Sequence, residues 1–458
     1  MARRRRHTPP FDLTLDRLGP KSCAVGTHDG QEVMVRSAPP GAVVHVVPFK
    51  RKQGVIHARR VHMVERPADY QEPPCTAFGL CGGCSLQELN LQAQRREKQR
   101  RIIGLFPGVV PRPIAGAPAA FGYRNKVELS FGTRCFLTEA DNAAGKSIHG
   151  RFLGFHAPGR FDRVVDVERC EIADPRMNAV ISAVKGWYSQ TSLAPWDVRE
   201  HVGFLKHLVV RASSVGQVLV ALYTAPPEAQ DAPVEQIEDE LRALAATLPA
   251  DGVLWFVNER VADAAIGPLR EVLAGQTTID EALGPVRYQL SATAFFQTNT
   301  AGAEVLYDVV AEAAGSGRRV LDLYCGTGAI GLYLGDRFQE VLGIEMNEAA
   351  VADARLNAQR NERSNIQYKA GKVEDNLPAL RDDDIAIVDP PRAGLHPKVA
   401  EYLANSGLST LVYVACKPES LARDRAVFEA AGWTLEWLQA VDLFPQTGHI
   451  EVVARFVR

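Results

Sequence analysis

The stretch "LDLYCGTGAIGL", residues 321–332, decides the fold of the C-terminal part of this 458-residue chain. Three glycines, Gly326, Gly328 and Gly331, directly follow a strand-like apolar run and lead into a helical pattern. A glycine loop placed between a strand and a helix binds a nucleoside cofactor. Glu345 ends the next apolar run, where its carboxylate is expected to bind two ribose hydroxyls. The loop alone fits a nicotinamide dinucleotide as well as S-adenosylmethionine.

Two further strand ends carry reactive groups. "IAIVDPPRAG" (385–394) places Asp389 at the carboxyl end of a strand, and the two prolines after it force an extended turn. "VYVACKPES" (412–420) ends its strand-like run at Cys416. Ligands of open α/β sheets bind beyond the carboxyl ends of the strands. The glycine loop, Asp389 and the thiol are therefore predicted to meet at one edge of one sheet.

A cysteine at this edge suits the methylation of carbon 5 of uracil. A thiolate added to carbon 6 raises the electron density at carbon 5, which then accepts the methyl group of a sulfonium cofactor, and a base removes the carbon 5 proton. "FPQTGHIEVVARF" (444–456) supplies Glu451 as the base, with His449 as its rival. We expect backbone dipoles and positive charge to make the Cys416 thiol easier to ionise.

The alternation of strands and helices predicts the domain organisation. From about residue 287 to 458 the two alternate, which predicts a doubly wound, mostly parallel sheet. Residues 121–284 mix strands with a helix near 234–248, which predicts an α+β domain. Short alternating runs between 11 and 66, broken by Gly and Pro, predict a small antiparallel β-barrel. The predicted domains are 10–68, 69–285 and 286–458.

Charge is unevenly distributed along the chain. Residues 1–64 contain twelve Lys and Arg against four acidic residues, and these cations include the run Arg3–Arg6. A second basic run, "QRREKQRR" (94–101), follows. Both favour a polyanionic partner such as a nucleic acid. No apolar run is long enough to span a bilayer and no signal peptide is recognisable, so we expect a cytoplasmic protein with no membrane partner.

The cysteines form an array that is typical of a metal site. "CTAFGLCGGC" (75–84) has C-x5-C-x2-C spacing. Its three cysteines and a distant fourth are the candidate ligands: Cys75, Cys81, Cys84 and Cys170. Four thiolates suit a [4Fe–4S] cluster or a tetrahedral zinc, and the unequal spacing favours the cluster. The cysteines with no predicted ligand role are Cys23, Cys135 and Cys325.

The chain resembles the RNA uracil-5-methyltransferase family, in particular its iron–sulfur type acting on 23S ribosomal RNA, over almost its full length. The matching pieces are "FFQTN" (295–299), "LDLYCGTG", "DPPRAG", "VYVACKP" and "TGHIE". The resemblance implies a Rossmann-like methyltransferase domain, S-adenosylmethionine as cofactor, Cys416 as nucleophile and Glu451 as base. The contacts it implies for the cofactor or its pocket are Gln297, Tyr324, Glu345 and Asp389, besides the loop glycines Gly326 and Gly328.

The resemblance has two departures and one further implication. Lys417 stands where asparagine is usual after the cysteine, and Ala329 stands where a polar residue is common in the cofactor loop. Neither removes a group that the chemistry requires. The basic N-terminal barrel resembles an OB-like TRAM domain, which implies RNA binding.

The uracil ring must leave its stack before a thiol can reach it, so a flipped or single-stranded nucleotide is expected. In the central domain, "FGYRNKVELSFG" (121–132) offers an aromatic ring and two cations to stack on and clamp RNA: Tyr123, Arg124 and Lys126. We infer no obligate protein partner.

Three other functions compete with this prediction. A transfer RNA uridine is a possible target within the same family. An amino-group methyltransferase needs no thiol, but it usually has an aromatic residue after the two prolines, where this chain has Arg392. A non-catalytic RNA-binding iron–sulfur protein would leave the pair Cys416 and Glu451 unexplained.

Overall fold

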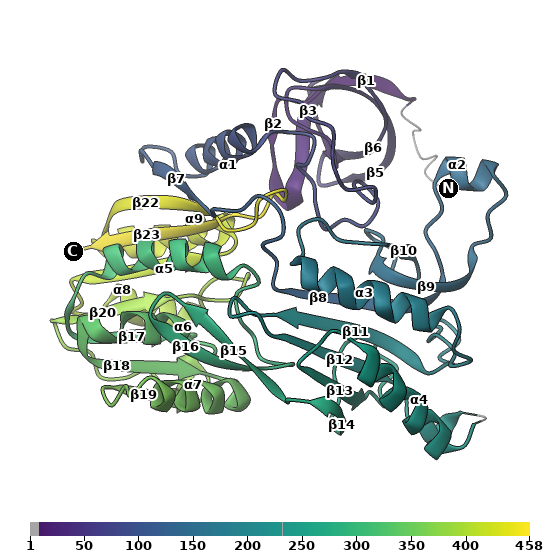
Figure 1. The fold of residues 1–458 in the computed structure, drawn as a ribbon. Coiled ribbons are helices and arrows are strands. Elements are labelled where there is room, and N and C mark those ends of the chain that lie inside the picture. Colours follow the sequence, from purple (N-terminus) through teal and green to yellow (C-terminus); the bar gives the residue numbers. More distant parts are fainter. Residues whose placement is uncertain (1–8, 231) are drawn as a thin grey trace, which may run out of the picture. The chain divides into compact units, whose positions relative to one another are not determined.

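The computed structural model describes residues 9–230 and 232–458 (Figure 1). The chain forms two compact units, and we describe each by itself. The first unit comprises Met1–Pro74, Gly83–Ala120 and Ala301–Arg458, and the second comprises Cys75–Gly82 and Phe121–Thr300. The run Arg3–Arg6 lies outside the described residues.

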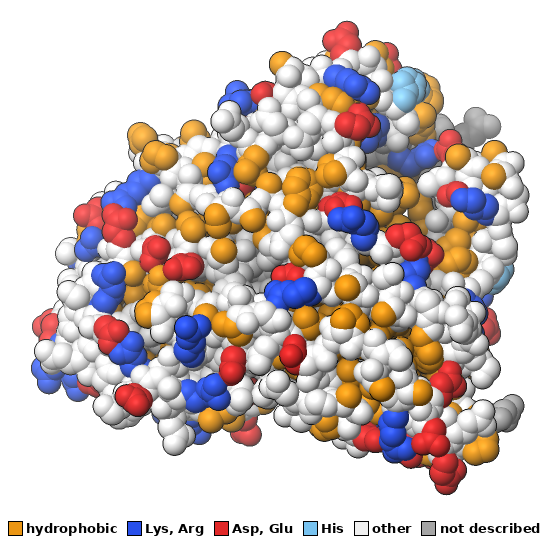
Figure 2. Space-filling model, viewed as in Figure 1, with side chains coloured by type: hydrophobic (Ala, Val, Ile, Leu, Met, Phe, Trp, Pro, Cys, Tyr) orange, Lys and Arg blue, Asp and Glu red, His pale blue; other side chains and the backbone are white. Residues whose placement is uncertain are grey.

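The face of the molecule in Figure 2 carries acidic and basic side chains side by side. Among the side chains visible there, neither sign forms an extended area of its own. A concentration of positive charge must therefore be sought in local clusters of residues.

A curled six-stranded sheet occupies the N-terminal part of the first unit (Figure 1). Its strands follow the order β1-β5-β6-β4-β3-β2. They are β1 (Phe11–Thr14), β2 (Arg17–Leu18), β3 (Cys23–His28), β4 (Gln31–Arg36), β5 (Val43–Lys52) and β6 (Val55–Glu65), with a short 3-10 turn η1 (Pro20–Ser22). The curled sheet confirms the predicted barrel-like domain. One pair, β4 with β6, is parallel rather than antiparallel, because the β5–β6 hairpin turns β6 back into the direction of β4.

An eight-stranded sheet forms the rest of the first unit, in the order β19-β18-β17-β20-β21-β23-β22-β7. Its strands are β7 (Arg112–Gly116), β17 (Gly317–Leu323), β18 (Phe338–Glu345), β19 (Ile366–Ala370), β20 (Asp384–Val388), β21 (Thr410–Ala415), β22 (Thr434–Asp442) and β23 (Glu451–Val457). The five strands from β17 to β21 are mutually parallel, whereas β23 runs antiparallel to both of its neighbours. This sheet confirms the predicted doubly wound domain.

The helices of the first unit connect these strands and pack on the sheet (Figure 1). They are α1 (Leu91–Leu105), α5 (Thr300–Ala314), α6 (Ala329–Leu334), α7 (Glu348–Arg360), α8 (Pro397–Ala404) and α9 (Pro418–Ala430), with the 3-10 turns η3 (Gly335–Arg337) and η4 (Val373–Asp375). Local sequence fixes where they begin. The Asn347 side chain caps α7, and α8 and α9 each begin at a proline, whose missing N–H costs nothing at that position.

A seven-stranded sheet organises the second unit, in the order β10-β9-β8-β11-β12-β13-β14. Its strands are β8 (Lys126–Arg134), β9 (His149–His156), β10 (Val164–Asp166), β11 (Leu205–Ala212), β12 (Val218–Thr224), β13 (Gly252–Val257) and β14 (Leu269–Gly275); a separate hairpin joins β15 (Thr278–Leu283) to β16 (Val286–Ser291). The helical elements are α2 (Glu139–Ala143), α3 (Pro175–Tyr188), α4 (Val234–Thr247) and the turn η2 (Pro227–Ala229). This mixture confirms the predicted α+β class.

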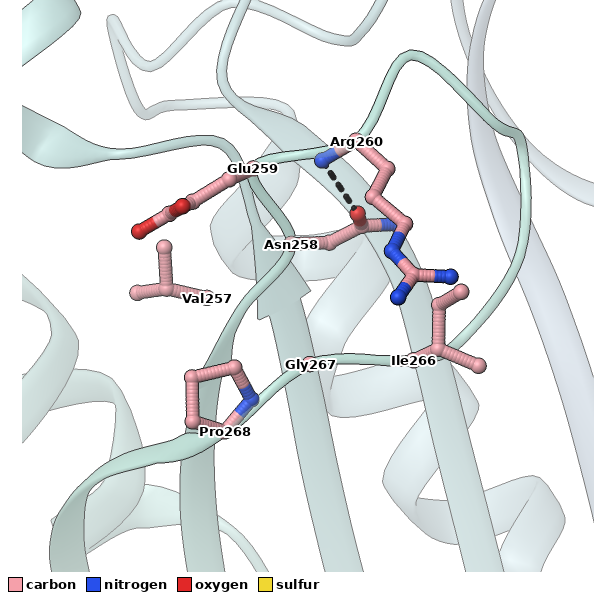
Figure 3. A pocket seen from close by; sticks show the side chains of 7 residues that line it. All are labelled: Val257, Asn258, Glu259, Arg260, Ile266, Gly267 and Pro268. Atoms are coloured by element: carbon pink, nitrogen blue, oxygen red, sulfur yellow. Dashed lines mark hydrogen bonds between the residues drawn. The ribbon is translucent and has the colours of Figure 1, made fainter.

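A hollow of about 520 Å³ lies beside the loop between β13 and β14 (Figure 3). The Asn258 side chain holds this loop by accepting the Arg260 N–H at 2.8 Å. The buried ammonium of Lys206 donates to the carbonyl oxygens of both residues, at 2.9 and 2.7 Å. None of the predicted site residues lines the hollow.

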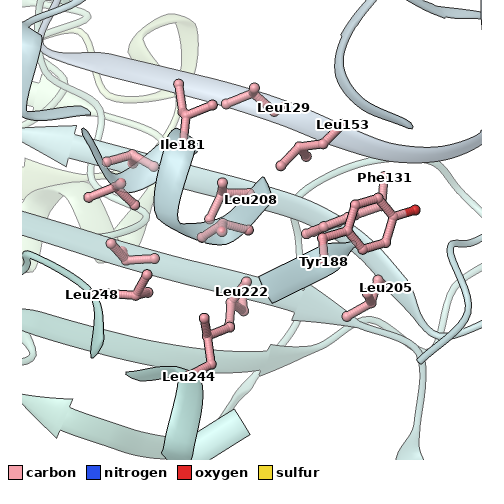
Figure 4. Close-up of a cluster of buried hydrophobic side chains, with 14 of the residues drawn as sticks. Leu129, Phe131, Leu153, Ile181, Tyr188, Leu205, Leu208, Leu222, Leu244 and Leu248 are labelled. Carbon is pink, nitrogen blue, oxygen red and sulfur yellow. The ribbon is translucent and has the colours of Figure 1, made fainter. Parts of the chain in front are cut away.

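The core of the second unit lies between its sheet and the helices α3 and α4 (Figure 4). Strand residues such as Leu129, Leu208 and Leu222 are fully buried against Ile181 of α3 and Leu244 of α4. Burying each such side chain contributes about 1.5–3 kcal/mol. The sheet is thereby a rigid support for the loops that extend from it.

Candidate active site

The carboxyl ends of the parallel strands bring the predicted site residues of the first unit together. Leu323 of β17 is paired with both Ile344 of β18 and Val388 of β20. Tyr324, Glu345 and Asp389 each occupy the next position along their strands, so all three lie at one edge.

Cys416 and Glu451 face each other across two antiparallel strands. Ala415 of β21 is paired with Val452 of β23, and the next step of this register sets Cys416 opposite Glu451. The electrostatics agree with the register, because the Glu451 and Asp389 carboxylates both help to raise the pKa of the Cys416 thiol. The nucleophile, base and acid predicted from separate motifs therefore share one space.

The negative charges around Cys416 are only partly offset by positive charge. Burial, with repulsion from Asp389, raises the pKa of Glu451 well above its usual range, and only 6% of this residue is exposed. Burial, with both neighbouring carboxylates, raises the pKa of Cys416 to about 11. The expectation of an easily ionised thiol is wrong for the ligand-free site, because burial and the two carboxylates outweigh the effect of the nearby cation.

That cation is Arg392, which the sequence reasoning missed as a site residue. Its charge opposes the raised pKa of both Cys416 and Glu451. Helix α9 fixes the loop that carries it: the Ser420 hydroxyl donates to the Arg392 carbonyl at 2.8 Å, and the Asp424 carboxylate accepts the Leu395 N–H at 2.9 Å. The signal was present in the sequence, because Arg392 directly follows the two prolines of the Asp389 motif.

The glycine loop has the shape of a cofactor cradle. The Glu345 carboxylate accepts the Gly326 N–H at 3.1 Å and the Asn347 N–H at 2.8 Å, which fixes its orientation at the end of β18. Gly328 begins α6 with φ of +74°, and a Cβ there would lie 2.3 Å from the Tyr368 hydroxyl. Only glycine fits at that position.

Two acids beside the loop, the buried Asp322 and the partly buried Asp389, favour a positively charged ligand. Burial raises the pKa of Asp322 to about 7, although the carboxylate accepts the Gly331 N–H at 2.9 Å. Burial, with Asp322 nearby, raises the pKa of Asp389 to about 7. The other Asp322 oxygen, Oδ1, has no hydrogen-bond partner among the described residues. Asp322 was also missed, although a charged residue inside an apolar strand is a recognisable signal.

Several predicted residues lie elsewhere or have other surroundings. Gln297 belongs to the second unit, where its carbonyl accepts the Asn125 side-chain N–H at 2.9 Å. Lys417 precedes α9 without a side-chain cap, and Ala329 is the first residue of α6. Tyr324 has φ of +66°, and burial raises its pKa to about 12.

The cysteine array is divided between the units. In the second unit, Cys75, Cys81 and Cys170 pack against one apolar core, and burial raises the pKa of Cys75 and of Cys170. Cys84 belongs to the first unit. None of the eight cysteines, all of which lie in the described part of the chain, forms a disulfide. Within 9–230 and 232–458, no three His, Cys, Asp or Glu side chains are arranged to hold a metal ion.

The predicted RNA-binding residues differ in their exposure. Tyr123 is only 9% exposed, and Arg124 donates from Nε to the Lys126 carbonyl at 2.8 Å. On the N-terminal barrel, by contrast, Phe49 is 68% exposed beside His57.

The basic run 94–101 forms ion pairs within the first unit, so part of its charge is already engaged. Four of its charged side chains are engaged inside the first unit: Arg95 and Lys98 with Asp442, Arg96 with Asp69, and Arg101 with Glu419. Arg100 pairs with Glu97 of the same helix. One face of α1 packs against β22 and α9, whereas the side chains of Arg96 and Arg100 remain exposed.

Comparison with known proteins places these features in a family context. Residues 237–456 match the family model described as tRNA (uracil-5-)-methyltransferase. An uncharacterized RNA methyltransferase of Chlorobaculum tepidum is 35% identical, over 98% of this chain and 96% of that protein. A second, from Caldanaerobacter subterraneus, is 34% identical, over 96% of this chain and 97% of that protein.

A solved structure agrees over nearly the full length. It is the Pyrococcus abyssi tRNA (uracil-54, C5)-methyltransferase in complex with S-adenosyl-L-homocysteine. It is 25% identical in sequence, with a TM-score of 0.77, and covers 98% of this chain and 100% of that chain. Among the described helices, none is long and apolar enough to cross a membrane.

Proposed function

The chain belongs to the RNA uracil-5-methyltransferase family, and from this we propose that it methylates carbon 5 of a specific uridine in 23S ribosomal RNA through a covalent adduct with Cys416. One observation carries the proposal: Cys416 of the β21 end stands opposite Glu451 at the start of β23, with Asp389 close to both. A methyltransferase that acts on an exocyclic nitrogen has no use for this pair.

The residues divide the chemistry between them. The Cys416 thiolate adds to carbon 6 of the uracil ring, and the electron pair of the carbon 5–carbon 6 double bond moves to carbon 5, which takes the methyl group. Glu451, in its carboxylate form, then accepts the proton from carbon 5. The double bond forms again, the bond between carbon 6 and sulfur breaks, and the thiolate leaves. Arg392 offsets the negative charge that the thiolate and Glu451 carry.

The glycine loop and its acids fit S-adenosylmethionine. When bound, this cofactor supplies a methyl group on a positively charged sulfur. Glu345 would accept the ribose hydroxyls, since each of its oxygens has a lone pair left after binding a backbone N–H. The acids Asp322 and Asp389, both with a raised pKa, would favour the positive charge. Tyr324, Gly326 and Gly328 line the loop, and Gln297 is included in the proposed contact set on family resemblance.

We further propose a [4Fe–4S] cluster on Cys75, Cys81, Cys84 and Cys170. The number and spacing of these cysteines support it. The described side chains form no preassembled metal group. Anaerobically reconstituted protein should contain about four iron and four sulfide per chain. Cys170→Ala should lose the iron while Cys135→Ala keeps it, and a zinc-loaded protein would overturn this assignment.

The barrel is the proposed RNA-binding surface, through a cluster that we call the barrel patch: Phe49, His57, Lys21, Arg36, Lys50 and Lys52. The exposed ring of Phe49 lies 6.5 Å from that of His57. Burial and the four cations together lower the pKa of His57. An exposed ring among cations suits an unpaired base and its phosphates. Arg124 and Lys126 remain proposed RNA contacts, whereas Tyr123 would have to become exposed before it could stack.

Salt dependence tests the barrel patch. Phe49→Ala should weaken RNA binding by about 1–3 kcal/mol with an unchanged salt slope. Lys50→Ala combined with Lys52→Ala should lower the slope of log K against log salt by about one to two. Lys146→Ala, an exposed lysine of the second unit, is the control. Equal slopes for the double variant and the control would remove the barrel patch from the RNA interface.

Trapping the adduct tests the reaction itself. Glu451→Gln should accumulate a methylated covalent protein–RNA adduct that survives a denaturing gel, because addition and methyl transfer proceed and proton removal does not. The further change Cys416→Ala should abolish the adduct. If Glu451→Gln forms no adduct, the base is His449 or water.

A transfer RNA uridine is the second candidate target, favoured by the likeness to the Pyrococcus abyssi enzyme, whose substrate is tRNA. Mass mapping of both RNA classes from cells that lack the protein distinguishes the two. A missing methyl group in 23S ribosomal RNA supports the first proposal, and one in tRNA supports the second. A cytoplasmic location, where both RNAs occur, belongs to either proposal.

A further inference from the structure

We propose that the segment Ser85–Arg101, which we call the clamp, positions the catalytic base, with Gln94 as its central positioning residue. The clamp acts on the base loop, Leu443–Ile450, which joins β22 to β23 and leads directly into Glu451. This inference rests on the proposed role of Glu451 and concerns residues that touch neither substrate nor cofactor.

Gln94 holds one residue of the base loop by two hydrogen bonds. Its Oε1 accepts the Gln446 N–H at 2.8 Å, and its Nε2 donates to Gln446 Oε1 at 2.9 Å. Nε2 also donates to the Leu89 carbonyl at 2.8 Å, which fixes the amide itself. Gln94 and Gln446 are both almost fully buried. A side-chain amide carries a donor and an acceptor at one end, and apolar residues of similar size have neither.

Gln446 needs such support because its backbone is strained. Its φ is +69°, in the left-handed region that costs a residue with a side chain about 1–2 kcal/mol. Such a conformation persists only where the surroundings determine it. The N–H groups of Ser85 and Leu86 both donate to the Gln446 carbonyl, at 2.9 and 3.0 Å. The clamp thus holds the amide, the carbonyl and the side chain of this one residue.

The remaining anchors lie on both sides of Gln446. Before it, the fully buried ammonium of Lys98 pairs with Asp442 and donates to the Phe444 carbonyl at 3.1 Å. After it, the Gly448 N–H donates to the Ser85 hydroxyl at 3.1 Å. The base loop is therefore fixed at every second residue from Asp442 to Gly448.

The clamp also includes the basic run 94–101. Its buried side chains Gln94 and Lys98 lie one helical turn apart, on the face of α1 that meets the base loop. A displacement of this loop moves Glu451 relative to the carbon that loses its proton. A misplacement of about 1 Å costs up to about 100-fold in rate.

The test compares proton removal with the earlier steps. With labelled RNA and labelled methyl donor, Gln94→Ala should raise the ratio of covalent adduct to released product by about tenfold or more. Addition and methyl transfer use Cys416, which the clamp does not contact. Because it is a ratio, this readout does not depend on how much of the variant folds. Gln94→Glu keeps the acceptor for the Gln446 N–H and should show a smaller rise.

Two further variants complete the test. Gln99→Ala removes a glutamine from the same helix whose side chain donates to the Arg112 carbonyl, and it should leave the ratio unchanged. Gly448→Ala places a Cβ 2.5 Å from the Ser22 hydroxyl and disturbs the base loop from its other side, so it should also raise the ratio.

The outcomes separate this inference from the proposed function. If Gln94→Ala matches Gln99→Ala, or loses product with no rise in adduct, the clamp has no positioning role. If Glu451→Gln itself traps no adduct, the proposed mechanism fails instead.

Discussion

Carboxylates at the two ends of the parallel strands in the eight-stranded sheet have opposite surroundings; we call the two ends the amino edge and the carboxyl edge. Strand β20 begins at Asp384 and is followed directly by Asp389. Asp384 receives Arg319 from β17, which donates from Nε at 2.8 Å and also from Nη2, and it accepts the Arg381 N–H at 2.7 Å. Asp389 forms no ion pair with any described residue, and its pKa is raised to about 7.

This difference separates a structural charge from a functional one. At the amino edge a cation offsets the cost of burying the carboxylate, so the pair can hold two strands together. At the carboxyl edge Asp322, Asp389 and Glu451 all have raised pKa values, with Arg392 as the opposing charge at Glu451. Carboxylates whose charge is not offset by a cation are unfavourable for folding. They are suited, however, to a ligand that carries a positive charge.

The largest effect should come from a substitution at the carboxyl edge, and it should lower the methyl transfer activity without changing the stability. We expect Cys416→Ala to lower methyl transfer by on the order of 10⁴-fold, because no other group can add to the ring. Its urea unfolding midpoint should stay close to that of the parent protein. Cys135→Ala, a buried cysteine of the second unit, should keep full activity. A fully active Cys416→Ala variant would remove the covalent mechanism.

The next largest effect should come from the amino edge and should concern stability. Arg319→Met leaves Asp384 buried without its cation, which should lower the free energy of unfolding by about 3–5 kcal/mol in urea titrations. Asp389→Asn is the matched change at the other end of the same strand. It should not lower stability at pH 8, because it removes a partly buried charge that forms no ion pair with any described residue. Equal losses in the free energy of unfolding for the two variants would contradict the proposed difference between the two edges.

A smaller effect should appear in how stability depends on pH. The pKa of Asp322 is about 7 in the folded protein against an ordinary 3.8, so the folded state holds more protons than the unfolded state between these values. The free energy of unfolding must then fall as pH rises from 4 to 7. Asp322→Asn should make this fall smaller, with Asp389 and its similar pKa responsible for the remainder, and should add on the order of 1–4 kcal/mol at pH 8. Parallel pH profiles for parent and variant would show that Asp322 is not the titrating group.

The smallest effect should be on the reactivity of the thiol. At pH 9, Glu451→Gln removes a negative neighbour and lowers the pKa of Cys416, so alkylation of the peptide that contains Cys416 should become about three- to tenfold faster. Arg392→Ala removes the positive neighbour and should slow the same alkylation. The rates are read by mass mapping of that peptide. Changes in the same direction for both variants would contradict the charge balance described for the site.

The meeting of the proposed site residues at one edge of the sheet was predictable because it depends on local patterns. Parallel strands must end at one edge, so motifs that follow strands are brought together, as Glu345 and Asp389 are. The pairing of Cys416 with Glu451 was predictable from the reaction, which needs a nucleophile and a base. The same reasoning overestimated the ease of ionising Cys416, because a motif does not reveal how many acids surround it.

The contacts that hold the base loop in place were not predictable from such patterns. Gln94 and Gln446 are 352 positions apart, and no periodicity in either segment indicates that they meet. For the same reason the basic run 94–101 does not reveal that Lys98 is fully buried. Strand β7 likewise joins the sheet at its far edge, beside β22. Solvent-exposed and buried cations have the same sequence signature until their partners are known.

The place of β23 in the sheet has a consequence for biosynthesis. It is the last strand in chain order, yet it lies in the interior, between β21 and β22. A nascent chain that has reached Cys416 therefore has its thiol but not yet Glu451, and the edges of β21 and β22 stay unpaired until β23 emerges. Partial products are thus expected to be both catalytically silent and prone to aggregate, because open apolar edges recruit other strands.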